Sequence, residues 1–233
     1  MPKRSKRFEQ AVNSVDRNKT YEPVEAFELL KSLPGAKFDE SVDVVVKLGI
    51  DPRKSDQLVR GAVSLPKGLG KSIKIVVFAE GDRAEAATAA GADEVGSGEL
   101  ADKIAGGWTD FDVVIASPDM MKHVGKLGRV LGPQGKMPSP KSGTVTPDVA
   151  QAVTEFKAGK VEFRTDAGGN VHAPLGKRSF SSQDLAANLQ AFLDHLAAMR
   201  PSAVKGVFMR KVSVSTTMGP GAWINYGAPT PTN

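Results

Sequence analysis

The middle of the chain alternates short apolar runs with helix-like segments. Apolar runs at residues 73–80 and 111–117 predict strands, and residues 82–92, 99–107 and 118–131 predict helices. Such alternation favours βαβ units with a parallel sheet. Helices cover both faces of a sheet of this kind, so its apolar runs are expected to be buried on both sides. The residues expected there are Val76, Val77, Val113, Val114 and Ile115.

The two flanks have a different pattern, with longer strands. Residues 21–34 predict a helix and residues 40–50 a strand. Residues 160–176 predict a hairpin around the turn sequence DAGGN, and residues 181–200 predict a helix capped by Ser181 or Ser182. A last strand is predicted at 207–220, where β-branched residues alternate with others. The expected apolar stripes are Val24, Phe27, Leu30 and Leu33 in the first helix, and Leu185, Leu189, Phe192, Leu193 and Leu196 in the second.

Neither flank alone has enough apolar surface for a secure core. We therefore predict an α/β protein with two domains. Residues 1–67 and 160–233 are expected to form one discontinuous α+β domain, and residues 68–159 an inserted, three-layer Rossmann-like domain. Residues 226–233 are rich in Pro, Gly and Thr, which predicts a disordered tail.

The stretch GLGKS at residues 68–72 has two interpretations. A phosphate-binding loop needs G-x-x-x-x-G-K-[ST] between a strand and a following helix, but Leu65 occupies the first glycine position and a predicted strand follows the loop. We therefore favour a joint, in which this stretch and residues 157–160 form two linker strands between the domains. Glycine tolerates the backbone changes of a hinge, and the candidates are Gly68, Gly70 and Gly159.

The sequence lacks the residue combinations of common catalytic and metal sites. It has no cysteine, no G-x-S-x-G, no H-E-x-x-H and no dinucleotide-binding glycine motif. The three histidines, His123, His172 and His195, are scattered without ligand spacing. We predict a protein that is not an enzyme and uses no cofactor or metal. A nucleotide-dependent enzyme built on the central domain is the alternative, and nucleotide-induced thermal stabilisation would favour it.

The charged residues are distributed unevenly along the chain. The net charge is +5 over 233 residues, but residues 73–116 hold nine acids and three bases. That stretch has a net charge of −6 and the rest of the chain +11, so a polyanion would be attracted to the flanks. Alternatively, the acidic helices are only solvated faces. No apolar run approaches the roughly 20 residues of a membrane span, and the basic N-terminus lacks the apolar core of a signal peptide, which predicts a soluble intracellular protein.

Three stretches are more specific than this general patterning. Residues 126–145 place Gly and Pro every few positions among Lys and Arg, which predicts an irregular basic loop that is either a solvated connection or an RNA contact. The other two are residues 37–71 and 212–225. Together and in this order, they closely resemble the bacterial family of large-subunit ribosomal protein one, and the resemblance extends to about Asn225.

The resemblance implies two domains, with the main RNA-binding surface on the discontinuous one. Members of this family bind ribosomal RNA of the mobile stalk, assist the movement and release of deacylated tRNA from the exit site, and often repress translation of their own mRNA. It further implies a cytoplasmic, ribosome-associated protein that is a monomer when free. A general RNA-binding module governed by phosphate neutralisation is the closest alternative, although the modest net charge favours specific binding.

The residues that match the family motif define the expected RNA surface. They are Lys37, Phe38, Ser41, Asp166, His172, Lys177, Thr217, Met218, Gly219 and Pro220. The lysines would contact phosphates, and Thr217 would offer its hydroxyl to a 2′-OH or a phosphate. Asp166 would need a specific donor, such as a base amino group. Phe38 and Met218 would support a sugar or base, although such residues taken alone are more typical of a core.

Overall fold

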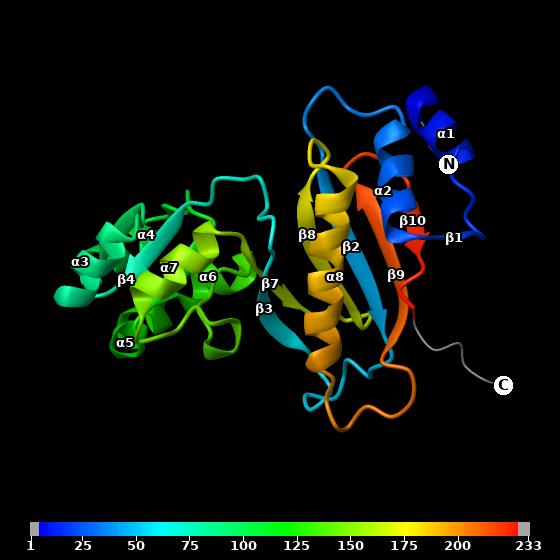
Figure 1. The fold of residues 1–233 in the computed structure, drawn as a ribbon. Helices are drawn as coiled ribbons and strands as arrows, with labels where there is room; N and C mark the ends of the chain where they lie inside the picture. Colours follow the sequence, from blue (N-terminus) through cyan, green and yellow to red (C-terminus); the bar gives the residue numbers. More distant parts are fainter. Residues whose placement is uncertain (1–4, 228–233) are drawn as a thin grey trace. The chain divides into compact units, whose positions relative to one another are not determined.

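The computed structural model describes residues 5–227, which form two compact units (Figure 1). The first unit contains the residues up to Gly70 and those from Val161 onward, and the second contains Lys71–Lys160. Both units combine helices with sheets, so the predicted α/β class is confirmed at this level. Of the predicted tail, residues 228–233 lie outside the described part of the chain.

A five-stranded sheet organises the first unit. Its strands lie in the order β1-β10-β9-β2-β8, and all neighbours are antiparallel except β1 and β10, which are parallel. The strands are β1 Thr20–Tyr21, β2 Ser41–Leu48, β8 Asn170–Lys177, β9 Met209–Thr216 and β10 Gly221–Ile224. Neither β1 nor β10 was predicted from the sequence. Burial alternates strictly along β2, because every second side chain points to the same face.

Helices α2, Pro23–Ser32, and α8, Ser182–Ala198, cover one face of this sheet (Figure 1). The Ser181 hydroxyl caps α8 by accepting a hydrogen bond from the Asp184 amide at 3.0 Å, and the five predicted apolar residues of α8 are buried. The predicted stripe of α2 is wrong at Val24, which is 40% exposed, because Ala26, Phe27 and Leu30 make the core contacts of this helix. A short helix, α1 Lys6–Asn13, precedes β1.

The predicted hairpin at residues 160–176 is wrong in its pairing. Strand β7, Lys160–Arg164, pairs with β3, Arg60–Ser64, in a separate two-stranded sheet, whereas β8 joins the larger sheet. A single bridge between Thr165 and Val171 is what connects the two predicted hairpin strands. The chain reverses at the predicted turn, but β7 leaves its expected partner because Val161 and Phe163 are drawn into the core of the first unit.

The second unit has a parallel sheet with helices on both faces. Its strands are β4 Ile75–Phe78, β5 Glu94–Gly96 and β6 Val113–Ala116, in the order β5-β4-β6. Ile75 and Val77 pack with helices α3, Asp82–Ala89, and α7, Val149–Lys157. Val76 and Phe78 pack in a second cluster with α4, Gly98–Ala105. All four side chains of β4 are therefore buried, as the apolar run predicts, and of the five residues expected inside only Val113 is partly exposed.

The chain after β6 forms short helical turns in place of the single predicted helix. These are the 3₁₀ turns η1 Pro118–Met120, η2 Gly125–Leu127 and η3 Pro140–Ser142, and the helices α5 Met121–Val124 and α6 Gly128–Gln134. The irregular loop predicted to begin at residue 126 begins instead at Gly135, whose φ of 71° ends α6. The prediction was wrong because Leu127 and Leu131, at helical spacing, are buried in the core.

The GLGKS stretch is a loop held at its beginning by α8. The Lys67 amide donates to Asn188 Oδ1 at 3.0 Å, and Asn188 Nδ2 donates to the carbonyls of Gly68 at 3.0 Å and Leu175 at 2.8 Å. A Cβ on Gly70 would lie 2.6 Å from the Phe180 ring, so this glycine packs closely as well. Neither GLGKS nor residues 157–160 forms the predicted linker strand, since the former is a loop and the latter spans the end of α7.

Replacing Asn188 should therefore destabilise the first unit. Asn188→Ala leaves the Lys67 amide and two carbonyls without their partner, and we expect the free energy of unfolding to fall by about 1–3 kcal/mol. Urea unfolding measures this change. Gln190→Ala on the exposed face of α8 is the matched control, expected to change stability by less than about 0.5 kcal/mol. Equal effects of the two variants would contradict this role of Asn188.

Candidate nucleic-acid interface

One end of the five-stranded sheet collects most of the residues expected to bind RNA. The register pairs Ser41 with Lys177 and Val42 with Thr216, so the start of β2 lies beside the ends of β8 and β9. The loop before β2 and the turn after β9 extend from this same end. We call the following residues the sheet-end cluster: Lys37, Phe38, Ser41, Lys177, Thr217, Met218, Gly219 and Pro220.

Direct hydrogen bonds join the two distant parts of this cluster. The Thr217 amide donates to the Ser41 carbonyl at 3.0 Å, and the Ser41 amide donates to the Thr217 hydroxyl at 3.0 Å. That hydroxyl also donates a hydrogen bond to the Ser41 carbonyl at 3.3 Å. A hydroxyl has one donor and two acceptor sites, so Thr217 keeps one acceptor site for a ligand donor. Lys177 also reaches this point, with its ammonium 3.1 Å from the Ser41 hydroxyl.

A buried carboxylate, Glu40, holds the two loops of the cluster together. Its side chain is 1% exposed and accepts hydrogen bonds from the Ala36 amide at 2.6 Å and the Met218 amide at 3.0 Å. Its charge is paired with Arg178, whose Nη1 lies 3.4 Å away. Arg178 also donates to the carbonyls at the end of α2, Lys31 at 2.8 Å and Leu33. The loop that carries Lys37 and Phe38 is thus tied to the turn that carries Thr217 and Met218.

The ionised form of Glu40 is favoured despite its burial. Burial alone raises the pKa of a carboxyl group. Hydrogen bonds from Ala36, Met218 and Thr216 and the charge of Arg178 lower the pKa of Glu40 by more than burial raises it. The net result is a pKa of Glu40 below its ordinary value. The sequence analysis did not identify Glu40 or Arg178. The alternation of β2 was an available signal, because Glu40 stands two residues before Val42 and so shares its buried face.

Phe38 and Met218 do not belong to the core. Their side chains are 55% and 50% exposed, and they stand among the most exposed large apolar residues in the described chain. This excludes the interpretation of both as core residues. Gly219 is held tightly, since a Cβ there would lie 2.3 Å from the Thr216 hydroxyl oxygen. The cluster therefore presents two apolar side chains and two lysines on a backbone that is fixed by hydrogen bonds.

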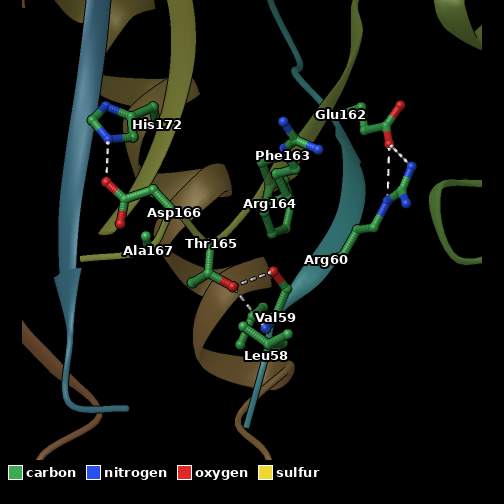
Figure 2. A pocket seen from close by; sticks show the side chains of 10 residues that line it. All are labelled: Leu58, Val59, Arg60, Glu162, Phe163, Arg164, Thr165, Asp166, Ala167 and His172. Carbon is green, nitrogen blue, oxygen red and sulfur yellow. Dashed lines mark hydrogen bonds and ion pairs between the residues drawn. The ribbon is translucent and has the colours of Figure 1, made fainter. Parts of the chain in front are cut away.

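Asp166 and His172 lie apart from the sheet-end cluster. His172 pairs with Val45, four residues along β2 from Ser41, a separation of about 13 Å at the usual rise of a strand. Asp166 lies in the turn before β8, and its carboxylate is 3.2 Å from the His172 ring (Figure 2). Eight of the ten predicted residues therefore gather at one end of the sheet, and these two do not.

Local groups already occupy the acceptors of Asp166. Its carboxylate accepts from the Asn170 side chain at 3.0 Å and the Asn170 amide at 2.7 Å, and also from the Gly168 amide at 2.8 Å. These bonds, with those of Asn170 the largest cause, hold the pKa of Asp166 well below its ordinary value. The donor that Asp166 was expected to need is thus supplied by its own turn.

Asp166 and His172 line a hollow beside the β3–β7 sheet (Figure 2). The other charged groups of this hollow are Arg164 and an ion pair between Arg60 and Glu162 at 2.7 Å. Within residues 5–227, no group of three or more potential ligands is placed to hold a metal ion. None of the helices described there is long and apolar enough to cross a membrane.

Comparison with known proteins adds independent information. Residues 29–220 match the model of the ribosomal protein L1p/L10e family. The chain is 57% identical over 226 residues to the large ribosomal subunit protein uL1 of Kosmotoga olearia, covering 97% of this chain and 98% of that protein. It is 54% identical over 222 residues to the protein of the same name from Nocardioides sp., covering 95% and 92%. These names belong to a ribosomal protein, in agreement with a function other than catalysis.

Replacement of Glu40 should destabilise the protein and reduce its sensitivity to acid. In Glu40→Gln the charge is lost and an NH₂ group faces backbone donors, so we expect the free energy of unfolding at pH 7 to fall by about 1–3 kcal/mol. A carboxyl group with a lowered native pKa contributes stability above its unfolded pKa, and this is lost as pH falls. Wild-type stability should therefore decrease below about pH 4.5, and this decrease should be smaller in the variant.

Urea unfolding of both proteins at pH 7, 5, 4 and 3 measures these changes. Asp39→Asn is the matched control, because Asp39 is an exposed carboxylate next in sequence that accepts hydrogen bonds from Ser179. We expect it to change stability at pH 7 by no more than about 0.5 kcal/mol. Glu40 would not be the tie between the loops if its variant were as stable as this control.

Proposed function

The chain belongs to the ribosomal protein L1p/L10e family, and on that premise we propose that it is a constituent of the large ribosomal subunit that binds the ribosomal RNA of the mobile stalk. The relatives are named as large-subunit proteins, which supports the first part of the proposal. The observation that carries the second part is the sheet-end cluster, in which residues from both parts of the first unit meet at one end of the sheet. Its exposed side chains are Lys37, Phe38, Thr217 and Met218, whereas Pro220 is buried.

The chemistry of the cluster suits a structured RNA. Recognition of folded RNA relies on shape, 2′-hydroxyls and unpaired bases that stack on side chains. Phe38 and Met218 offer apolar surfaces to a sugar or base, and Thr217 retains an acceptor for a 2′-hydroxyl. Lys37 and Lys177 are placed to contact phosphates, which fix the register of the RNA.

Specific recognition is favoured over binding by phosphate neutralisation alone. The Ser41–Thr217 and Glu40–Met218 hydrogen bonds hold the cluster in one geometry, so little freedom is lost when RNA binds. A purely electrostatic binder needs no such framework, and it is usually more basic than a chain of net charge +5. In this proposal Asp166 orients His172, and the two form a second contact with the RNA, apart from the sheet-end cluster.

We further propose that the protein assists the movement and release of deacylated tRNA from the exit site. It also represses translation of its own mRNA, since a surface that recognises an RNA fold binds any RNA that adopts it. The protein acts in the cytoplasm on the ribosome and is a monomer when free. The second unit is an inserted Rossmann-like domain that takes no nucleotide.

Truncation of the two exposed apolar residues tests the RNA surface. Stacking of a base on an aromatic ring contributes about 1–3 kcal/mol, so Phe38→Ala should weaken binding to a folded stalk RNA fragment by about fivefold or more. Met218→Ala should also weaken binding, because an apolar contact is lost. Stability should hardly change, because both side chains are already about half exposed. Equilibrium binding at several salt concentrations, together with urea unfolding, measures both properties.

Val24→Ala is the matched control, since Val24 is an apolar side chain of the same unit with 40% exposure. An unrelated RNA hairpin of equal length tests specificity. Thr217→Ser keeps the hydroxyl and should preserve the preference for stalk RNA, whereas Thr217→Val should lose it. Equal affinity for both RNAs, with the same steep dependence on salt in every variant, would show a basic RNA binder only.

The proposal includes a hinge between the two units, which positions the tRNA-contacting part during release. Among the candidates, Gly68 is bonded to Asn188 and Gly70 packs on Phe180. We therefore assign the pivot to residues 71–73, which lie between Gly70 and the hydrogen-bonded Lys74, and to Gly159, whose φ of 110° suits glycine. These positions coincide with the ends of the two compact units.

Distance distributions between fluorophores test the hinge. The chain has no cysteine, so paired substitutions such as Thr88→Cys with Gln190→Cys place one label in each unit. We expect a broader distribution for this pair than for Lys54→Cys with Gln190→Cys, a control pair within the first unit. Equal widths for the two pairs in the free protein would argue against the hinge.

A further inference from the structure

A second surface with nucleic-acid chemistry surrounds Trp223 on strand β10. The indole is 37% exposed and stands on the face of the sheet opposite to the core, since its neighbours Ala222 and Ile224 are buried. Hollows lie on two sides of it. The lining of one includes Arg17, Ser213, Gly219 and Pro220. The lining of the other includes Arg17, Arg210 and Lys211.

The charge of this surface is of one sign. Arg17, Arg210 and Lys211 are exposed, and none of them has an ion-pair partner within residues 5–227. No acidic residue is among the described residues that line the two hollows. The Lys211 ammonium lies over the Trp223 ring, 5.2 Å from its centre, in a cation–π contact. A base that stacks on this ring would displace the ammonium, which could then contact the phosphate.

The surface adjoins the sheet-end cluster. Gly219 and Pro220, which belong to that cluster, also line the first hollow. On the neighbouring strand, Ser213 pairs with Trp223 and Ser215 with Gly221, so two hydroxyl side chains point to the same face as the indole. The Trp223 surface is therefore continuous with the sheet-end cluster through the turn at Gly219 and Pro220.

We propose that the Trp223 surface binds an unpaired nucleotide of single-stranded RNA, with its base stacked on the indole and its phosphates on Arg17 and Lys211. The proposal extends the proposed RNA-binding function and rests on it for the continuity of the two surfaces. Aromatic rings beside unpaired cations are the usual platform for single strands, because every base has a face that stacks. A base within a duplex is already stacked and cannot use this ring, so single strands are preferred.

The two tryptophans of the chain make the test direct. Trp108 lies in the second unit, where it packs against Phe111 with ring centres 5.2 Å apart. In Trp108→Phe, the fluorescence comes from Trp223 alone. We expect a hexa-adenylate RNA to quench it in a saturable way, and an RNA duplex of equal length to quench it much less. Urea unfolding checks that this background variant is folded.

Substitutions within that background assign the contacts. Lys211→Gln and Arg17→Gln should each weaken the hexa-adenylate affinity several-fold and reduce its dependence on salt, because a phosphate contact is removed. Lys54→Gln removes one exposed charge of the same unit that lines neither hollow, and it should have little effect. Trp223→Ala, followed by anisotropy of a labelled hexa-adenylate, should lose roughly tenfold or more.

The outcomes separate this proposal from the function it extends. Loss of stalk RNA binding in Thr217→Val with hexa-adenylate quenching retained would support two distinct contacts. Absence of quenching, equal quenching by the duplex, or stronger quenching by a poly-glutamate peptide would overturn the Trp223 proposal. Any of those results, combined with intact stalk RNA binding by wild type and its loss in Phe38→Ala, would leave the sheet-end function standing.

Discussion

A single buried carboxylate is the constraint on which the proposed binding surface depends. A charge removed from water is tolerated only when it is paired and fully hydrogen-bonded. Glu40 meets this condition because it accepts hydrogen bonds from the Ala36 and Met218 amides in two loops. It also forms an ion pair with Arg178, which follows β8. Met218 is 178 positions away from Glu40 in the chain. The requirement of one side chain thus fixes the place where the N-terminal and C-terminal parts of the first unit meet.

The one-sided packing of the sheet explains why its other surface is free for ligands. Helices α2 and α8 use one face, and their buried leucines and Phe192 supply the core there. The opposite face carries polar side chains such as Asp43, His172 and Ser213. Burial raises the pKa of Asp43 while the charges of Lys177 and His172 lower it, with a net increase.

The sequence predicted the elements with strong periodicity well. β2, β9 and α8 have clear patterns, and Ser181 is a recognisable cap, so tertiary contacts only confirm them. The errors arose where tertiary burial outweighed local signals. Val161 and Phe163 take β7 away from its predicted hairpin. Strands β1 and β10 are short, and their pairing is not encoded in any local pattern.

The candidate site was predictable only in part, for similar reasons. Its residues came from resemblance to a family, and the register of β2 with β8 and β9 explains why eight of them meet. Asp166 and His172 came from the same resemblance, and the turn before β8 places them apart from the other eight. Glu40 was missed although the alternation of β2 places it inside. A charged residue at a buried position is a stronger signal than the alternation. Its partner can be far away in the sequence, so it has to be sought over the whole chain.

Amide hydrogen exchange with and without the stalk RNA fragment tests the central claim most directly. The account predicts that RNA slows exchange in the loop at residues 36–41 and in the turn at 216–221, which Glu40 joins. Exchange in α3 and α7 of the second unit should be unchanged. Slower exchange confined to the second unit, or no change at either loop of the sheet-end cluster, would contradict the account.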